Sequence, residues 1–288
     1  YGESLWRNNT VNEKANKQEK NISNLASGEN EISSFDQNET LSLLHKTGFD
    51  QTLLSDIQSW SSWSEFKDLP LADALKHITV GLSDRYRSAV ELKTQNKIAL
   101  IGSPGVGKTT TLCKFLAHEV FMNKTCPMVL KVESGVPNPD DALRIFCEVV
   151  GVTLFRQAES VPLATDDSPL YLDFPGLSLN NLDDWTTTKS TLDDLEVETR
   201  VLVVNGAYDK DILYKNINTA NHLGATHLAI THFDEISNST KLWPLILRSN
   251  LTPLCICNGQ NVTGDFTTGV LNQMISRTFP EELYAKGF

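Results

Sequence analysis

The run Gly102-Ser-Pro-Gly105-Val-Gly107-Lys108-Thr109 constrains the fold more than any other part of this 288-residue chain. It lies between an apolar stretch and a segment with helical spacing, and it matches G-x-x-x-x-G-K-[ST] in the strand-loop-helix context that this motif requires. The glycines let the backbone curl so that successive N–H groups point inward, and the helix N-terminus adds partial positive charge. A fortuitous glycine-rich turn would lack both neighbours. We therefore predict a phosphate-binding loop made by Gly102, Ser103, Gly105, Val106, Gly107, Lys108, Thr109 and Thr110.

Two side chains of this loop have chemistry beyond the backbone. Lys108 can reach the β- and γ-phosphates of a nucleotide, and the Thr109 hydroxyl can bind Mg²⁺. The motif therefore predicts nucleotide and Mg²⁺ as cofactors, with the base undetermined.

From residue 97 onward, strand-like and helical segments alternate. Short apolar runs predict strands at residues 97–102, 128–132, 170–173, 201–205, 227–231 and 254–257. Helices are predicted between them at 108–121, 140–150, 182–195, 211–223 and 242–250. Strands joined by helices of this length favour an α/β fold, a mostly parallel sheet with helices on both faces. We expect residues 97–288 to form this domain, with its ligand at the carboxyl ends of the strands.

Before residue 97 the sequence does not alternate between strand-like and helical segments. Residues 1–38 are polar, so we predict a disordered lead-in or linker. Residues 39–96 show helical spacing of apolar residues, with breaks at Gly48 and Pro70, and predict a small bundle of four short helices. These helices would contain residues 41–44, 53–57, 71–78 and 86–92.

Two later segments bear on the choice of base. Asp234 follows a buried strand, and its carboxylate can accept two hydrogen bonds from guanine that adenine cannot donate. Asn258, Gly259 and Gln260 end another strand and would cover the base from the opposite side. Taken singly, Asp234 is better explained as a helix N-cap, because the stretch with Ser237 and Asn238 is rich in capping residues. An ATPase with a deviant loop is the other alternative, in which Asp234 would have no purpose.

The order of these segments resembles a known family. The loop continues as Gly105-Val-Gly-Lys-Thr-Thr-Thr111, Asp173-Phe-Pro-Gly176-Leu177 matches D-T-A-G-R, and Thr231 to Glu235 matches T-K-x-D-E. With the closing Asn258-Gly-Gln260, this pattern is similar to the signal-recognition-particle-type GTPases, most closely their flagellar branch. The resemblance implies a helical N domain before a P-loop G domain, binding of GTP or GDP with Mg²⁺, and pairing of two such domains.

The resemblance also assigns catalytic residues and shows departures. It places Glu133 near the water-orienting carboxylate, Asp173 at Mg²⁺ together with Thr109, and the Gly176 N–H at the γ-phosphate. Two arginines expected of the family are Val136 and Leu177 here. Because one arginine can contribute ~10³–10⁵ in phosphoryl-transfer rate, we expect nucleotide binding with slow GTP hydrolysis. A pseudo-GTPase, an interaction module without useful turnover, remains the alternative.

Charge and cysteine content limit the partners. Lys and Arg number 25 against 36 Asp and Glu, a net charge of −11, which argues against a nucleic-acid partner. Five cysteines without metal-ligand spacing predict buried thiols in a reducing compartment. The first residues lack a basic head and an apolar core, so we expect no secretory signal. We expect a cytoplasmic location, with a homodimer or a second domain of the same type as partner, and peripheral contact at the inner face of the cell membrane.

Overall fold

A computed structural model of the chain describes residues 38–88, 92–133 and 141–279. These residues contain one eight-stranded sheet in the order β3-β2-β4-β1-β5-β6-β7-β8, parallel except for the β7–β8 pair. The strands are β1 (Lys97–Ile101), β2 (Met128–Lys131), β3 (Thr153–Phe155), β4 (Leu170–Asp173), β5 (Thr199–Asn205), β6 (His227–Thr231), β7 (Thr252–Cys257) and β8 (Phe266–Thr267).

The predicted α/β class is confirmed, and each of the six predicted strands is present. Sequence reasoning missed β3 and β8, because three and two residues are too few to show a periodicity. Both lie at the edges of the sheet, so the strands that support the predicted loop are the ones that were expected.

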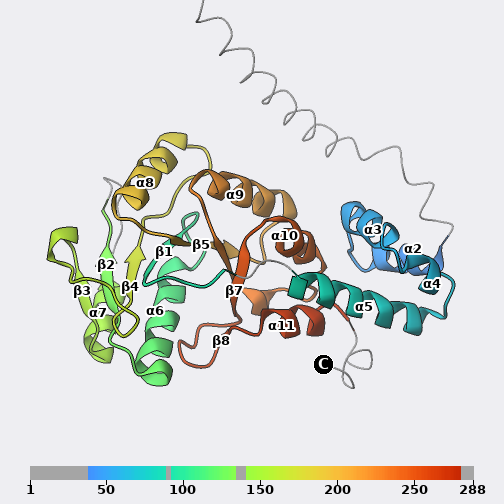
Figure 1. The fold of residues 1–288 in the computed structure, drawn as a ribbon, viewed down its shortest axis with the longest axis horizontal. Helices are drawn as coiled ribbons and strands as arrows, with labels where there is room; N and C mark the ends of the chain where they lie inside the picture. Colours follow the sequence, from blue (N-terminus) through green and yellow to red (C-terminus); the bar gives the residue numbers. More distant parts are fainter. Residues whose placement is uncertain (1–37, 89–91, 134–140, 280–288) are drawn as a thin grey trace, which may run out of the picture.

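Helices cover both faces of the sheet, as Figure 1 shows. Ile98 and Leu100 of β1 belong to an apolar cluster with α6 (Lys108–His118) and α7 (Asp141–Val150). Ala99 and Ile101 belong to a second cluster with α8 (Leu182–Asp194) and α9 (Lys210–His222). Alternate residues of a strand point to opposite faces, so one short apolar run supplies both layers.

The helical region consists of α2 (Glu39–Lys46), α3 (Gln51–Gln58), α4 (Trp63–Phe66) and α5 (Leu71–Ser88). Two of these helices begin at a side-chain cap, since Asn38 Oδ1 accepts from the N–H of Leu41 and Asp50 Oδ1 from that of Leu53. The third predicted helix, at 71–78, is present, but the fourth, at 86–92, does not begin as a separate helix. Residues 71–88 form one helix, because nothing between them breaks it, and the short α4 precedes it.

Gly81 lies inside α5 without ending it. A Cβ at this position would collide with the Trp60 ring, so the glycine is explained by close packing between α5 and the segment after α3. The predicted boundary between an N domain (39–96) and a G domain (97–288) stays a prediction. The predicted linker at 1–38 lies outside the described residues except for Asn38.

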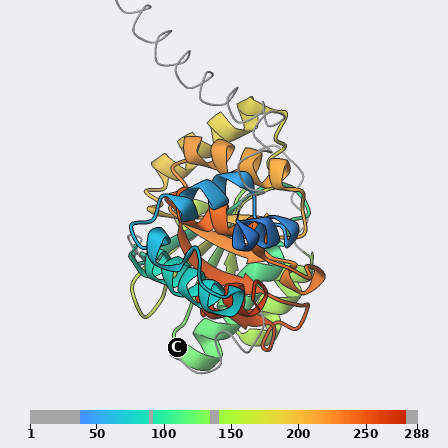
Figure 2. The same ribbon diagram turned by 90° about the vertical axis from the view of Figure 1, so that its right-hand side faces the viewer.

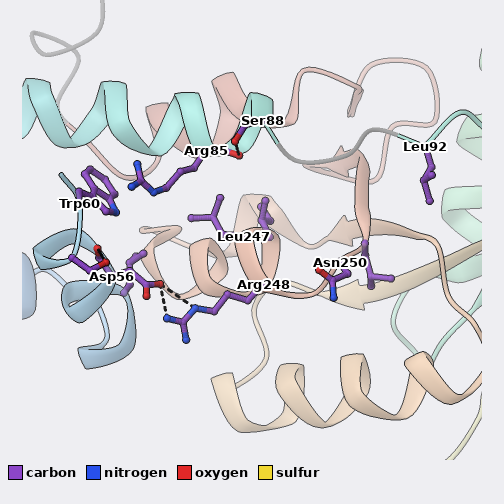
Figure 3. A pocket seen from close by; sticks show the side chains of 12 residues that line it. Asp56, Trp60, Arg85, Ser88, Leu92, Leu247, Arg248 and Asn250 are labelled. Carbon is purple, nitrogen blue, oxygen red and sulfur yellow. Dashed lines mark hydrogen bonds and ion pairs between the residues drawn. The ribbon is translucent and has the colours of Figure 1, made fainter. Parts of the chain in front are cut away.

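The helical region stands at one end of the sheet, beside α10 (Trp243–Arg248) and α11 (Val270–Ser276), as Figures 1 and 2 show. Asp56 of α3 and Arg248 of α10 form an ion pair, and Lys210 Nζ lies 3.0 Å from an Asp50 carboxylate oxygen. A hollow of about 600 Å³ opens at this junction. Figure 3 shows Trp60, Arg85 and Leu247 among its lining.

This hollow lies away from the predicted loop. Its lining residues Leu92 and Leu251 come just before β1 and β7, at the amino ends of the strands, whereas the predicted loop follows the carboxyl end of β1.

In the part of the chain that the structure describes, every helix is too short or too polar to cross a bilayer. Four cysteines are buried as expected, but Cys126, in the turn before β2, is exposed.

Candidate phosphate-binding site

The loop between β1 and α6 has the curled backbone that its sequence predicts. Gly102, Gly105 and Gly107 have φ angles of 147°, 75° and 88°, a region that residues with a side chain rarely adopt. A Cβ at Gly102 would lie 2.5 Å from the carbonyl oxygen of Val203, so close contact with β5 adds a second reason for glycine there. Helix α6 begins at Lys108, which aims its N-terminus at the loop.

Lys108 extends into the curl of the loop. Its Nζ donates to the carbonyl oxygens of Gly102 (3.1 Å) and Ser103 (2.9 Å), and the residue is 8 % exposed. Burial lowers the pKa of Lys108 to about 8; nearby Asp173 opposes this shift and Lys131 adds to it. The ammonium group thus lies inside the loop, where the motif would hold the phosphates of a nucleotide. With its pKa near 8, the group loses its charge more readily than an exposed lysine does.

The other loop residues fix its position. Ser103 Oγ hydrogen-bonds to Asn216 Oδ1 of α9 at 2.7 Å. The carbonyl of Val106 accepts from Thr231 Oγ1 at 2.8 Å, which ties the loop to the end of β6. Thr110 is exposed on the first turn of α6. These contacts hold the loop on both sides without using the N–H groups inside it.

Asp173 lies beside the loop at the end of β4. Both of its carboxylate oxygens are 3.5 Å from Thr109 Oγ1, so the two residues predicted to bind Mg²⁺ do come together. Lys131, the last residue of β2, forms an ion pair with the same carboxylate, and both side chains are fully buried. Sequence reasoning missed Lys131, although a single lysine ending the apolar run Met128-Val-Leu-Lys131 was a signal.

The segment after β4 packs against the loop. The N–H of Leu177 donates to the Gly102 carbonyl at 3.0 Å, and a Cβ at Gly176 would lie 2.6 Å from Pro104 Cα. Gly176 is therefore held at the loop, where the resemblance places it. The Leu177 side chain is fully buried in the core, so this position directs its side chain away from the loop.

Glu133 lies two residues after β2 with its side chain 65 % exposed, and its carboxylate is 3.8 Å from the Arg156 guanidinium. Its predicted water-orienting role stays a prediction. Val136, the other departure from the family pattern, lies outside the described residues.

Asp234 lies in a short 3₁₀ turn, η4 (Phe233–Glu235), directly after β6. His232 precedes it with a positive φ of 53°, and this bend turns the chain at the strand end. The carboxylate is exposed and does not cap a helix, since His232 occupies the cap position of this turn. The structure therefore leaves Asp234 available to a ligand at the same sheet edge as the loop.

The segment Asn258–Gln260 follows β7 and is fastened to α6. Lys114 is 1 % exposed, and its Nζ donates to the carbonyls of Gly259 (2.7 Å) and Asp265 (2.6 Å). Asn258 Oδ1 is buried and has no hydrogen-bond partner among the described residues. A buried carbonyl oxygen left this way is an acceptor for a ligand.

Three segments predicted from the sequence are thus joined at one edge of the sheet. Thr231 bonds the end of β6 to the loop, and Lys114 bonds the segment after β7 to the helix that the loop begins. Across the described residues, no three His, Cys, Asp or Glu side chains form a cluster that could hold a metal.

Comparisons with known proteins find likeness in structure only. No protein-family model and no curated protein matches the sequence. A crystal structure of FlhF complexed with GMPPNP/Mg²⁺ matches with a TM-score of 0.65 and 17 % identity, over 82 % of this chain and 99 % of that chain.

Two FtsY structures match similarly. The signal recognition particle receptor FtsY from Elizabethkingia anophelis, in complex with GDP, has a TM-score of 0.63 and 18 % identity, over 82 % of each chain. Chloroplast FtsY from Physcomitrella patens has a TM-score of 0.67 and 14 % identity, over 85 % of this chain and 89 % of that chain. The chain therefore has the fold of the FlhF and FtsY structures, the fold that the resemblance to signal-recognition-particle-type GTPases predicted.

Proposed function

We propose that this chain binds a guanine nucleotide, GTP or GDP, as a switch protein of the signal-recognition-particle type. The observation that carries this proposal is the joining of the phosphate loop, the Asp234 turn and the Asn258 segment at one sheet edge. The loop supplies inward N–H groups and Lys108 for the phosphates.

The base would lie between the other two segments. The Asp234 carboxylate accepts two hydrogen bonds, from N1–H and the exocyclic amine of guanine, and adenine offers no such pair of donors. The buried Asn258 Oδ1, without a partner among the described residues, supplies a further acceptor. The similar FlhF structures are complexes with GTP/Mg²⁺ and with GMPPNP/Mg²⁺, which supports guanine over adenine.

Hydrolysis by this site would be slow. The buried Leu177 replaces the arginine of the family pattern, and its side chain points into the core rather than to the phosphates. Without that positive charge the developing negative charge of the transition state is less stabilised. Asp173, Gly176 and Glu133 would then contribute positioning, and an activating partner would have to supply the rest.

In the cell, such a switch would pair with a second copy or with another domain of this type. We place it in protein targeting or in placement of the flagellum, in the cytoplasm and in peripheral contact with the membrane. This part of the proposal is supported by the fold shared with FlhF and with the receptor FtsY.

A competition titration tests the guanine assignment. Fluorescent GTP analogue is titrated into the full chain, and unlabelled GTP, ATP or XTP is then added. We expect GTP to displace the probe and ATP at equal concentration to leave it bound. Displacement by ATP would contradict the assignment of Asp234 to the base.

Asp234→Asn gives a sharper test, since asparagine donates where aspartate accepts. We expect the variant to lose affinity for GTP and gain affinity for XTP, each by roughly tenfold or more, as a bonded pair at the base edge contributes about 1–3 kcal/mol. Glu235→Gln is the matched control, because it removes the neighbouring exposed carboxylate and should leave the preference for GTP unchanged.

Single-turnover assays separate the switch from the pseudo-GTPase. GTP is preloaded on the chain and phosphate release is followed, alone and with a candidate partner domain. Release that rises strongly with the partner favours the switch. Release that stays at the uncatalysed rate in both cases favours the interaction module.

A further inference from the structure

We propose that Lys131 is a built-in cation that takes the place of Mg²⁺ beside Asp173, so that this chain binds its nucleotide without a divalent metal. The inference rests on the guanine-nucleotide binding proposed above and specifies its metal requirement. It starts from one ion pair, between Lys131 Nζ and Asp173 Oδ2.

The sheet brings this pair together at the carboxyl ends of β2 and β4. Lys131 and Asp173 are the last residues of β2 and β4, and they are register partners in adjacent parallel strands. Both side chains are fully buried. The ammonium group is therefore placed by the backbone of two strands, and it meets a carboxylate that lies 3.5 Å from Thr109 Oγ1.

The residues present do not fit Mg²⁺ as the family pattern would have it. Mg²⁺ is held by oxygen ligands and keeps several of its waters. Here the carboxylate that would hold it or its water accepts a hydrogen bond from an ammonium group instead. A divalent ion next to Thr109 would also lie close to the positive charge of Lys131, and like charges repel most strongly where water is excluded.

Lys131 performs one electrostatic task that a metal otherwise performs. An uncompensated Asp173 carboxylate would repel the phosphates of a nucleotide held by the loop. Paired with Lys131, it leaves the positive charge of Lys108 as the net charge of the three groups.

The test compares nucleotide affinity with and without metal. A fluorescent GDP or GTP analogue is titrated into the full chain in excess Mg²⁺ and in EDTA. We expect the two dissociation constants to agree within about threefold, and added Mn²⁺ to show no proton-relaxation enhancement from the protein–nucleotide complex beyond that of free nucleotide. A wild-type affinity that falls tenfold or more in EDTA overturns this inference alone. No binding in either buffer overturns the proposed function, and the inference with it.

Substitutions then assign the effect to Lys131. Lys131→Met exposes the phosphates to the Asp173 charge, and we expect binding in EDTA to be at least tenfold weaker than in Mg²⁺, about 1.4 kcal/mol. Lys131→Met with Asp173→Asn removes both charges and should bind equally in the two buffers. Lys97→Met is the matched control, since Lys97 begins β1 at the opposite sheet edge and bonds the Leu195 carbonyl.

Each variant is first checked by circular dichroism and thermal unfolding. If Lys131→Met does not fold, the wild-type protein and the double variant still test whether Lys131 replaces the metal, because neither contains an unpaired buried charge. A double variant that needs Mg²⁺ for tight binding would show that the Lys131 charge is not what replaces the metal.

Discussion

Replacing Lys114 tests how the segment after β7 is held to the phosphate loop. Lys114 belongs to α6, the helix that the loop begins, and its buried ammonium bonds the carbonyls of Gly259 and Asp265. Lys114→Met keeps the length and the apolar stem of the side chain but removes both hydrogen bonds. We expect the variant to be less stable and to bind guanine nucleotide more weakly, because Asn258 beside Gly259 loses its support.

The size of the stability loss follows from the two contacts. A hydrogen bond from a charged group contributes about 1.5–3 kcal/mol, so the two give about 3–6 kcal/mol. The Asp265 carbonyl keeps a second donor, the N–H of Asn258, so it is not left unpaired. Removing a buried ammonium also relieves its desolvation, which offsets part of that loss. We therefore expect the free energy of unfolding to fall by about 2–3 kcal/mol.

Urea unfolding followed by tryptophan fluorescence measures this loss, with nucleotide titration on the same samples. Lys241→Met is the matched control, since Lys241 is partly exposed and makes a single bond of 2.7 Å to the Tyr208 carbonyl. We expect it to lose about 1 kcal/mol or less and to bind nucleotide normally. Equal losses for the two variants would refute the reasoning that Lys114 fastens the closing segment.

Three further predictions concern the loop and its neighbours. Lys108→Ala should abolish nucleotide binding in calorimetry while the chain still folds by circular dichroism, because Lys108 lies in the loop after β1 and outside both apolar clusters. Because the Lys108 pKa is about 8 and phosphates favour the charged form, affinity should fall about threefold to fourfold between pH 7 and 8.5. Lys108→Arg stays charged, so a wild-type profile as flat as that of this variant would contradict the assignment. Leu177→Arg should lower stability by about 3 kcal/mol or more without speeding single-turnover hydrolysis, since it buries a charge in the core. Faster hydrolysis with native stability would show that this side chain reaches the phosphates.

Local patterns in the sequence were enough to predict the frame of the molecule. The apolar runs of the central strands and the glycines of the loop each act within a few residues, and the structure has them where expected. Helix α5 was predicted as two helices, and the contact of Gly81 with Trp60 inside it follows only from the folded structure.

Contacts between distant residues were beyond sequence reasoning. Lys131 meets Asp173 only because β2 and β4 are neighbours in the sheet, and that strand order is not the order along the chain. Lys114 bonds a carbonyl 145 positions away. The sequence shows both lysines as charges in apolar surroundings, and the partner of each follows from topology alone.

The two outermost strands limit how this protein can associate. Strand β3 has three residues, and β8 has two and runs antiparallel to its neighbour, so neither side offers a long row of unpaired backbone groups. Edge strands this short offer few backbone N–H and C=O groups to a strand of another molecule, which protects against sheet extension and aggregation. Another molecule would therefore be recognised through side chains and loops rather than through strand pairing. Substitutions on those surfaces can change recognition without exposing a strand edge that could pair into fibres.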